Sequence, residues 1–256
     1  LPADITVSNG EPFVWCSSLT ELIVTPGVSG EISNGFSSML GLNDQSIETV
    51  EISERVMRVG DGAFQNFKSL RVVMFPESLT EIGVYAFMRC SSMRSMSLPE
   101  TLEVIQGQAF LGCTGLVSVT IPNGVDEVGS MAFNDCTGLT SVTMPVDLPT
   151  LSFFDGCASI ERVTLTPGKT GIGNDLRTSG QGRPWCESEK DEVVVNLEYG
   201  IISLGDSFFS GGSSGLKSLT FPDSLEIIGS NPFKGCTGME SLKLGSKTEI
   251  DWQSVA

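Results

Sequence analysis

"LVSVTIPNGVDEVGSMAFNDCTGLTSVTMP" (residues 116–145) contains the same short pattern at both of its ends. The opening L-V-S-V-T-I-P returns as L-T-S-V-T-M-P, and the second copy begins 23 residues after the first. Self-similarity at a fixed period of about 20–50 residues is typical of proteins that are built from stacked repeats. The stretch therefore predicts a repeat architecture, and the same pattern extends in both directions along the chain.

An apolar-x-x-apolar-x-apolar pattern occurs ten times, with one weaker copy at Glu192. The spacings between copies are 28, 23, 23, 23, 23, 21, 32, 24 and 23 residues, and four consecutive spacings of 23 are hard to obtain by chance. The copies begin at Leu19, Ile47, Leu70, Met93, Leu116, Leu139, Ile160, Glu192, Leu216 and Met239.

Other residue types recur in the same register within each copy. A proline follows the first apolar segment, then come a second apolar pair, a glycine, an Ala-Phe pair and a cysteine. One unit cannot bury its apolar side alone, whereas stacked units bury continuous columns of leucine, valine, isoleucine, phenylalanine and cysteine. The sequence therefore predicts a solenoid of about ten rungs of about 23 residues. Its aligned phenylalanines would be Phe64, Phe87, Phe110 and Phe133.

The unit IGVYAFMRCSSMRSMSLPETL (residues 82–102) resembles the leucine-rich repeats of BspA-like surface proteins, also called Treponema-type repeats. Those repeats follow I-G-x-x-A-F-x-x-C-x-x-L-x-x-V-x-I-P, and the match covers residues 56–145 almost without a gap. The resemblance implies a β-rich leucine-rich-repeat solenoid. It would have short parallel strands on one side and 3₁₀ or turn segments on the convex side. It also implies a place on the cell surface and a role in adhesion.

Two stretches interrupt the period, near residues 27–46 and 168–191. Each follows a Thr-Pro-Gly motif, at Thr25 and Thr166, and is rich in the turn-forming residues Gly, Ser, Asp and Asn. We expect both to bulge from one edge as loops. Residues 1–256 are predicted to form a single solenoid. Because the chain starts in the middle of a rung, we expect it to be a fragment of a longer array.

Charge and composition narrow the classes of partner. The formal net charge is −16, from 31 acidic and 15 basic residues, so nucleic acid and anionic lipid surfaces are poor partners. No apolar run approaches the roughly 18 residues of a membrane span. Histidine is absent, which removes the commonest general base and most zinc sites. We find no nucleophile with a plausible base and no phosphate-binding loop, so we predict no enzymatic activity and no cofactor or metal.

Six of the seven cysteines occupy one column, whose members are Cys16, Cys90, Cys113, Cys136, Cys157 and Cys236. Stacked side chains point the same way, so their Cβ atoms stay about 4.8 Å apart, beyond the usual disulfide range. We expect buried, reduced thiols that act as small apolar residues. Cys186 lies outside the column, beside Trp185, and is a candidate for an exposed thiol, although a packed position is the alternative.

Side chains alternate faces along a strand, so the outward positions of the first strand of each unit form one continuous polar face. In leucine-rich repeats this face is the concave one and often holds the partner. Ordinary solvated strand chemistry is an alternative, and an ordered-water lattice on the hydroxyls is another. The candidate binding residues are Ser95, Ser97, Ser118, Thr120, Ser141, Thr143, Thr164, Ser218 and Thr220.

Two further surfaces are weaker candidates. The same face turns apolar at Ile23, Val72 and Met74, which is a hint of an interaction site if the three lie together. Carboxylates recur on the second extended segment, at Glu81, Glu103, Asp126, Glu127 and Glu226. They could bind Ca²⁺, but a charged edge that discourages aggregation is the better account.

Together these patterns predict a non-catalytic scaffold that binds a protein or an extracellular-matrix ligand at the cell surface or outside the cell. The alternative is a passive structural rod that stacks end to end with neighbouring chains.

Overall fold

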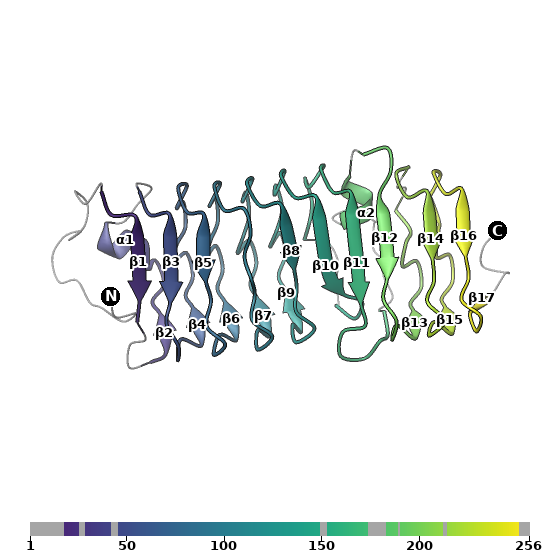
Figure 1. Cartoon of the computed structure of the whole chain (residues 1–256), viewed down its shortest axis with the longest axis horizontal. Helices are drawn as coiled ribbons and strands as arrows, with labels where there is room; N and C mark the ends of the chain where they lie inside the picture. The colour runs from purple at the N-terminus through teal and green to yellow at the C-terminus, as the bar shows by residue number, and fades with distance from the viewer. Residues whose placement is uncertain are drawn as a thin grey trace.

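The computed structural model describes residues 18–25, 29–41, 46–148, 153–173, 183–188, 190–211 and 214–250. Figure 1 shows rungs stacked side by side along one axis, from purple at the N-terminal end to yellow at the C-terminal end. Each regular rung contributes a longer strand, a two-residue strand and a set of turns. The prediction of a parallel repeat solenoid is confirmed, and its count of about ten rungs is approximate.

The longer strands form the first column. Nine of the ten predicted segments are strands in the described part of the chain, and all of their pairings are parallel. The strands are β1 (Glu21–Val24), β3 (Thr49–Ile52), β5 (Val72–Met74), β8 (Ser118–Thr120), β10 (Ser141–Pro145), β11 (Arg162–Thr166), β12 (Val194–Leu197), β14 (Ser218–Thr220) and β16 (Ser241–Lys243).

The tenth segment, residues 93–98, is not a strand, and it divides the column into β1-β3-β5 and β8 through β16. Its centre reads Ser95-Met96-Ser97, where the next two rungs read Ser-Val-Thr. Serine and methionine lack the branched Cβ that favours extended backbone, so the local strand preference is lower here. The predicted candidates Ser95 and Ser97 therefore lie on irregular extended backbone. The neighbouring rung still contacts it, because Val117 N donates to Arg94 O at 3.0 Å.

The two-residue strands form a second column, which is also parallel. It is divided into two sheets, β2-β4-β6-β7-β9 and β13-β15-β17. The strands are β2 (Glu31–Ile32), β4 (Arg58–Val59), β6 (Glu81–Ile82), β7 (Val104–Ile105), β9 (Glu127–Val128), β13 (Ser203–Leu204), β15 (Ile227–Ile228) and β17 (Glu249–Ile250).

The segment that carries Ala-Phe and Cys consists of consecutive turns, with no 3₁₀ helix in the described residues. Its backbone N–H groups alternate between two kinds of acceptor. Ala86 N and Met88 N donate within the turn to Gly83 O and Tyr85 O, whereas Phe87 N donates to Ala109 O of the next rung at 2.8 Å. This alternation satisfies buried backbone groups without a helix.

Phenylalanine rings form an aligned row through the core, as the sequence predicts. The rings of Phe64, Phe87, Phe110 and Phe133 are fully buried and stacked, with centroids 5.2–5.4 Å apart. The rings of Phe87 and Phe110 are within 4° of parallel. Each such aromatic pair contributes about 0.5–1.5 kcal/mol beyond its buried area. The row fixes the register between successive rungs.

The glycine column is required by close approach between rungs. A Cβ on Gly129 would lie 2.3 Å from the backbone N of Gly107, and one on Gly60 would lie 2.2 Å from Ile32 O. These are backbone atoms, which cannot move aside cheaply. Glycine here lets neighbouring turns touch.

The expectation that residues 27–46 form a loop is wrong for the described part. Strand β2 pairs with β4, and helix α1 (Phe36–Leu40) follows it. Phe36 is fully buried, with its ring 6.1 Å from that of Phe64. The stretch EISNGF therefore supplies a second strand and a core ring, and only a few residues are additional. Phe13 and Cys16 lie outside the described residues.

The second predicted loop, near residues 168–191, also contributes to the coil. Ile172 pairs with Ser203 as a parallel bridge, and helix α2 (Pro184–Glu187) places Trp185 in the core, fully buried, with its ring 5.5 Å from Phe209. Arg183, almost fully buried, donates from one guanidinium nitrogen to the carbonyls of Ser207, Phe208 and Ser210. Cys186 lies on α2, and its side chain is outside the described positions.

Candidate functional site: the outward face of the first column

The first-column strands present their alternate side chains to solvent. We call this surface the strand face. It comprises Glu21, Ile23, Thr49, Glu51, Val72, Met74, Ser95, Ser97, Ser118, Thr120, Ser141, Thr143, Arg162, Thr164, Val194, Asn196, Ser218, Thr220, Ser241 and Lys243.

Strand register arranges the polar candidates in two rows across the rungs. One row runs Ser118, Ser141, Arg162 and Val194, and resumes with Ser218 and Ser241. The other row is continuous over six strands and consists of Thr120, Thr143, Thr164, Asn196, Thr220 and Lys243.

All nine predicted residues face solvent to some degree. Thr143, Thr164 and Ser141 are half-buried, and the other six, Ser95, Ser97, Ser118, Thr120, Ser218 and Thr220, are exposed. The register brings Thr120, Thr143 and Thr164 onto adjacent strands, whereas Ser95 and Ser97 lie where the sheet is interrupted. The sequence also did not single out Asn196, which completes the threonine row.

Charge is distributed unevenly between the two columns. From Val72 to Lys243 the strand face carries no carboxylate, and its charged side chains are Arg162 and Lys243. Along the edge where the strands begin, three ion pairs join neighbouring rungs: Arg71–Glu48 at 3.6 Å, Lys190–Glu161 at 3.0 Å and Lys217–Glu240 at 3.7 Å. The strand face is therefore depleted of negative charge on a strongly acidic chain.

The second column carries most of the recurring carboxylates. Glu31, Glu103, Asp126, Glu127 and Glu226 are exposed there. Several are compensated by nearby cations: Arg58 lies 3.2 Å from Glu81, and Lys169 pairs with Asp126 at 2.5 Å. In the described residues, no three His, Cys, Asp or Glu side chains are grouped closely enough to hold a metal ion.

At the N-terminal end of the strand face, on β1, β3 and β5, apolar and polar side chains lie side by side. Ile23, Val72 and Met74 are 44–46% exposed, but Glu51 lies between Ile23 and Met74 in the register, and Thr49 lies beside Val72. The three apolar side chains therefore occupy the first and third strands with polar residues between them. They form a broken patch, which weakens their case as a separate docking site.

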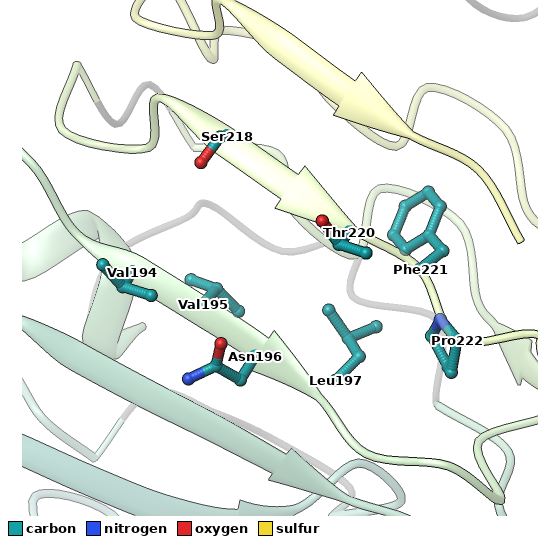
Figure 2. A pocket seen from close by; sticks show the side chains of 8 residues that line it. All are labelled: Val194, Val195, Asn196, Leu197, Ser218, Thr220, Phe221 and Pro222. Carbon is teal, nitrogen blue, oxygen red and sulfur yellow. The ribbon is translucent and has the colours of Figure 1, made fainter.

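A groove of about 370 Å³ lies on the strand face between β12 and β14, and sequence reasoning did not predict it. The described strand pairing is shortest here: β12 and β14 share two register pairs, whereas the other first-column neighbours share three to five. In Figure 2, Leu197 lies between the ends of the two strands, with Phe221 and Pro222 on the β14 side. The groove is lined by Val194, Val195, Asn196, Leu197, Ser218, Thr220, Phe221 and Pro222.

Four members of the cysteine column, Cys90, Cys113, Cys136 and Cys157, are free and buried, as predicted, whereas Cys236 is only partly buried and Cys16 lies outside the described residues. The described thiols also make hydrogen bonds that the sequence did not reveal. Each thiol donates to the carbonyl oxygen of the preceding rung's phenylalanine, at 3.0–3.3 Å. Burial raises the pKa of Cys90 well above its ordinary value and the pKa of Cys113 to about 12. A hydrogen bond with Cys157, together with burial, raises the pKa of Cys136. These thiols stay protonated and are poor nucleophiles at neutral pH.

The described residues contain no helix with the length and apolar character that a bilayer crossing requires. The architecture, parallel repeats with phenylalanine and cysteine columns inside and a polar strand face outside, defines a leucine-rich-repeat scaffold. The chain belongs to the BspA-type leucine-rich repeat family, whose model matches six copies over residues 42–161 and 191–254. Comparison with the curated proteins found no match.

Several solved structures are similar to the chain. The leucine-rich repeat protein TpLRR of T. pallidum is 29% identical, over 57% of this chain and 73% of that protein, with a TM-score of 0.48. A leucine-rich repeat protein from Bacteroides ovatus is 22% identical, over 85% of this chain and 65% of its own length, with a TM-score of 0.47. One from Eubacterium ventriosum is 17% identical, with coverages of 79% and 61% and a TM-score of 0.44.

Proposed function

We propose that this chain is a non-catalytic binding scaffold, displayed at the cell surface or outside the cell, that holds a protein or extracellular-matrix ligand on the strand face. The membership in a leucine-rich-repeat family supports protein interaction as the general role. We further propose that residues 1–256 form one solenoid. Adhesion is the specific role that the family resemblance suggests.

The observation that carries this proposal is the loss of negative charge on the strand face. The chain has 31 acidic residues, yet the outward positions from Val72 to Lys243 include none of them. The centres of protein interfaces are depleted of charged residues because burying an unpaired charge is costly. The second column keeps its carboxylates, so the depletion is confined to the strand face and supports a binding role there.

The test is a pair of matched variants, Thr120→Arg on the strand face and Thr137→Arg on the exposed turn after Cys136. Both add one guanidinium to an exposed threonine of the same repeat. The immobilised chain is exposed to purified collagen, laminin and fibronectin in turn. We expect Thr120→Arg to weaken capture at least tenfold and Thr137→Arg to leave it unchanged.

Two results would count against the proposal. Equal weakening by both variants would show that binding lies elsewhere or that it depends only on net charge. Failure of the unmodified chain to capture any of the three would remove the matrix role. Light scattering on the same samples addresses the alternative, because self-association that grows with concentration would favour a structural rod.

A further inference from the structure

We propose that the groove between β12 and β14 is a specificity subsite, which takes an extended partner segment of the pattern carboxylate-x-apolar-x-carboxylate. This inference rests on the proposed function, since it names the kind of protein segment that the strand face would hold. The argument uses the groove, the two cations that flank it, and the spacing of the rungs.

The groove is uncharged, and both apolar and polar side chains line it. Leu197 is half-buried and Phe221 is buried, while Asn196, Ser218 and Thr220 are exposed around them. An apolar side chain seated between Leu197 and Phe221 would remove apolar surface from water, and the surrounding amide and hydroxyl groups would face a peptide backbone. Most ligand sites combine these features, with apolar walls and a few polar groups that fix orientation.

The groove lies between two cations. Arg162 pairs with Val194 in the register, on one side of the groove, and Lys243 pairs with Thr220, on the other. They are the charged side chains of this part of the strand face, and both are exposed. Neither forms an ion pair within the described residues, although the field of Lys243 reaches Asp223. A partner that carries carboxylates at matching positions would therefore be complementary to this part of the chain.

The spacing of the rungs determines which partner sequence pattern would fit. Rungs are about 4.8 Å apart, so the centre of the groove is about 7 Å from the strand of Arg162 and about 7 Å from the strand of Lys243. In an extended peptide, residues i and i+2 point the same way and are about 6.7 Å apart. A segment that lies across the strands would thus place residue i+2 in the groove and residues i and i+4 near the two cations. Arg162 and Lys243 are offset by two residues along their strands, so the segment crosses obliquely and the long side chains make up the difference.

The long-range field of the chain opposes an acidic partner, because the net charge is −16. This repulsion is screened beyond about 8 Å at physiological salt, so the local cations dominate once the segment is in contact. The consequence is that the affinity should depend on the placement of the two carboxylates rather than on their number.

A fluorescent peptide, acetyl-Ser-Asp-Thr-Leu-Thr-Asp-Ser-amide, is the probe, and its anisotropy is measured against the whole chain at physiological salt. We expect Arg162→Gln and Lys243→Gln each to weaken binding by about threefold to fivefold, as for exposed ion pairs. Replacing the peptide's leucine by serine should weaken binding at least tenfold. Thr220→Trp places a ring over the groove. It should therefore abolish the difference in affinity between the leucine peptide and the serine peptide. Lys234→Gln is the matched control, because Lys234 is an exposed cation on the turn edge and should not affect binding.

Three outcomes would overturn the proposal. The first is no binding of the peptide. The second is equal binding of a peptide with its two aspartates adjacent. The third is displacement by a heparin tetrasaccharide together with no dependence on leucine, which would indicate a general anion site. If the peptide fails while Thr120→Arg still abolishes capture of a matrix protein, the subsite is wrong and the binding scaffold stands. Binding of the peptide without capture of any matrix protein would support the subsite and remove the matrix ligand.

Discussion

In the regular part of the coil, residues 56–145, successive phenylalanine rings are nearly parallel, at 4–18°. In the irregular part, residues 160–221, the Trp185 ring is tilted 52° from Phe209, and Phe208 is tilted 74° from Phe209. In the first region the row takes one ring from each rung, and the Phe67 and Phe75 rings pack edge-on against it, whereas the second region fits an indole and a pair of phenylalanines at the equivalent place. Within the second region β12 and β14 share only two register pairs, and the groove lies between them.

In this architecture, regularly stacked rungs form an even strand face, whereas the groove lies among rungs that differ from one another. Identical rungs interdigitate and leave a flat surface, since every side chain meets its own copy on the next rung. The two shared register pairs between β12 and β14 coincide with the hollow in the strand face.

Removing a ring from the regular row should have the largest effect. Phe110→Ala leaves a cavity between two stacked rings that cannot collapse, and we expect a loss of about 3–5 kcal/mol in the free energy of unfolding. Val117→Ala, at a residue that is 47% exposed, should cost less than about 1 kcal/mol. Urea denaturation measures both. Equal losses would show that the row does not carry the stability of the regular region.

The stability of the irregular region should instead depend on hydrogen bonds from the buried Arg183 side chain. Arg183→Met removes a charged donor from three backbone carbonyls, those of Ser207, Phe208 and Ser210. Hydrogen bonds to charged groups contribute about 1.5–3 kcal/mol, so we expect a loss of about that size. Hydrogen exchange should localise the change to residues near 183–211. A uniform increase in exchange, including residues 56–145, would contradict the idea of a separately anchored region.

The thiol column predicts a loss of stability in alkali. The unfolded Cys113 thiol ionises near pH 9, whereas the folded thiol ionises near 12. Below pH 9 both states hold the proton, so the thiol contributes no pH dependence. Above pH 9 only the unfolded state releases it, and stability falls as pH rises, by about 1.4 kcal/mol per pH unit. The Cys113→Ala variant should show a correspondingly shallower decline in stability between about pH 9.5 and about pH 11.

Only the slope of stability against pH matters for this test, because the substitution also changes stability at neutral pH. Parallel slopes for the two proteins would contradict a raised pKa. Cys90 and Cys136 should act in the same direction, since their pKa values are also raised.

The smallest effect should come from repairing the interrupted rung. Met96→Val with Ser97→Thr converts Ser-Met-Ser to the Ser-Val-Thr of the next two rungs and should favour a strand at residues 93–98. Strand preferences span about 1 kcal/mol, so we expect a gain of at most that amount. Hydrogen exchange at this segment should slow. A loss of stability would show that Met96 fills space that valine cannot.

The sequence was sufficient for the periodic part of this fold. Ring and thiol columns recur at a constant interval, and burial of Phe87, Phe110, Cys90 and Cys113 follows directly from stacking. The first-column strands were predictable for the same reason. Strand register also follows from the period, because a repeat of constant length aligns equivalent residues on neighbouring rungs.

The remaining features depend on contacts between unlike rungs, which a period does not encode. Trp185 replaces a phenylalanine without matching the Ala-Phe motif, so its place in the core was missed. The groove lies where β12 and β14 share only two register pairs, and the period does not give the length of a pairing. The thiol hydrogen bonds need the position of a carbonyl oxygen on another rung. For the candidate site, the sequence predicted the strand face but not Asn196 or the flanking role of Arg162.

The buried thiol column also changes how cysteine content should be weighed. Unpaired cysteines usually suggest a reducing compartment, because exposed thiols are oxidised outside the cell. Here Cys90, Cys113, Cys136 and Cys157 are enclosed, and each proton is held by a backbone carbonyl. The four sulfur atoms are protonated at neutral pH and buried away from solvent, so they react slowly with oxidants. These four enclosed thiols are therefore compatible with an oxidising environment as well as with a reducing one.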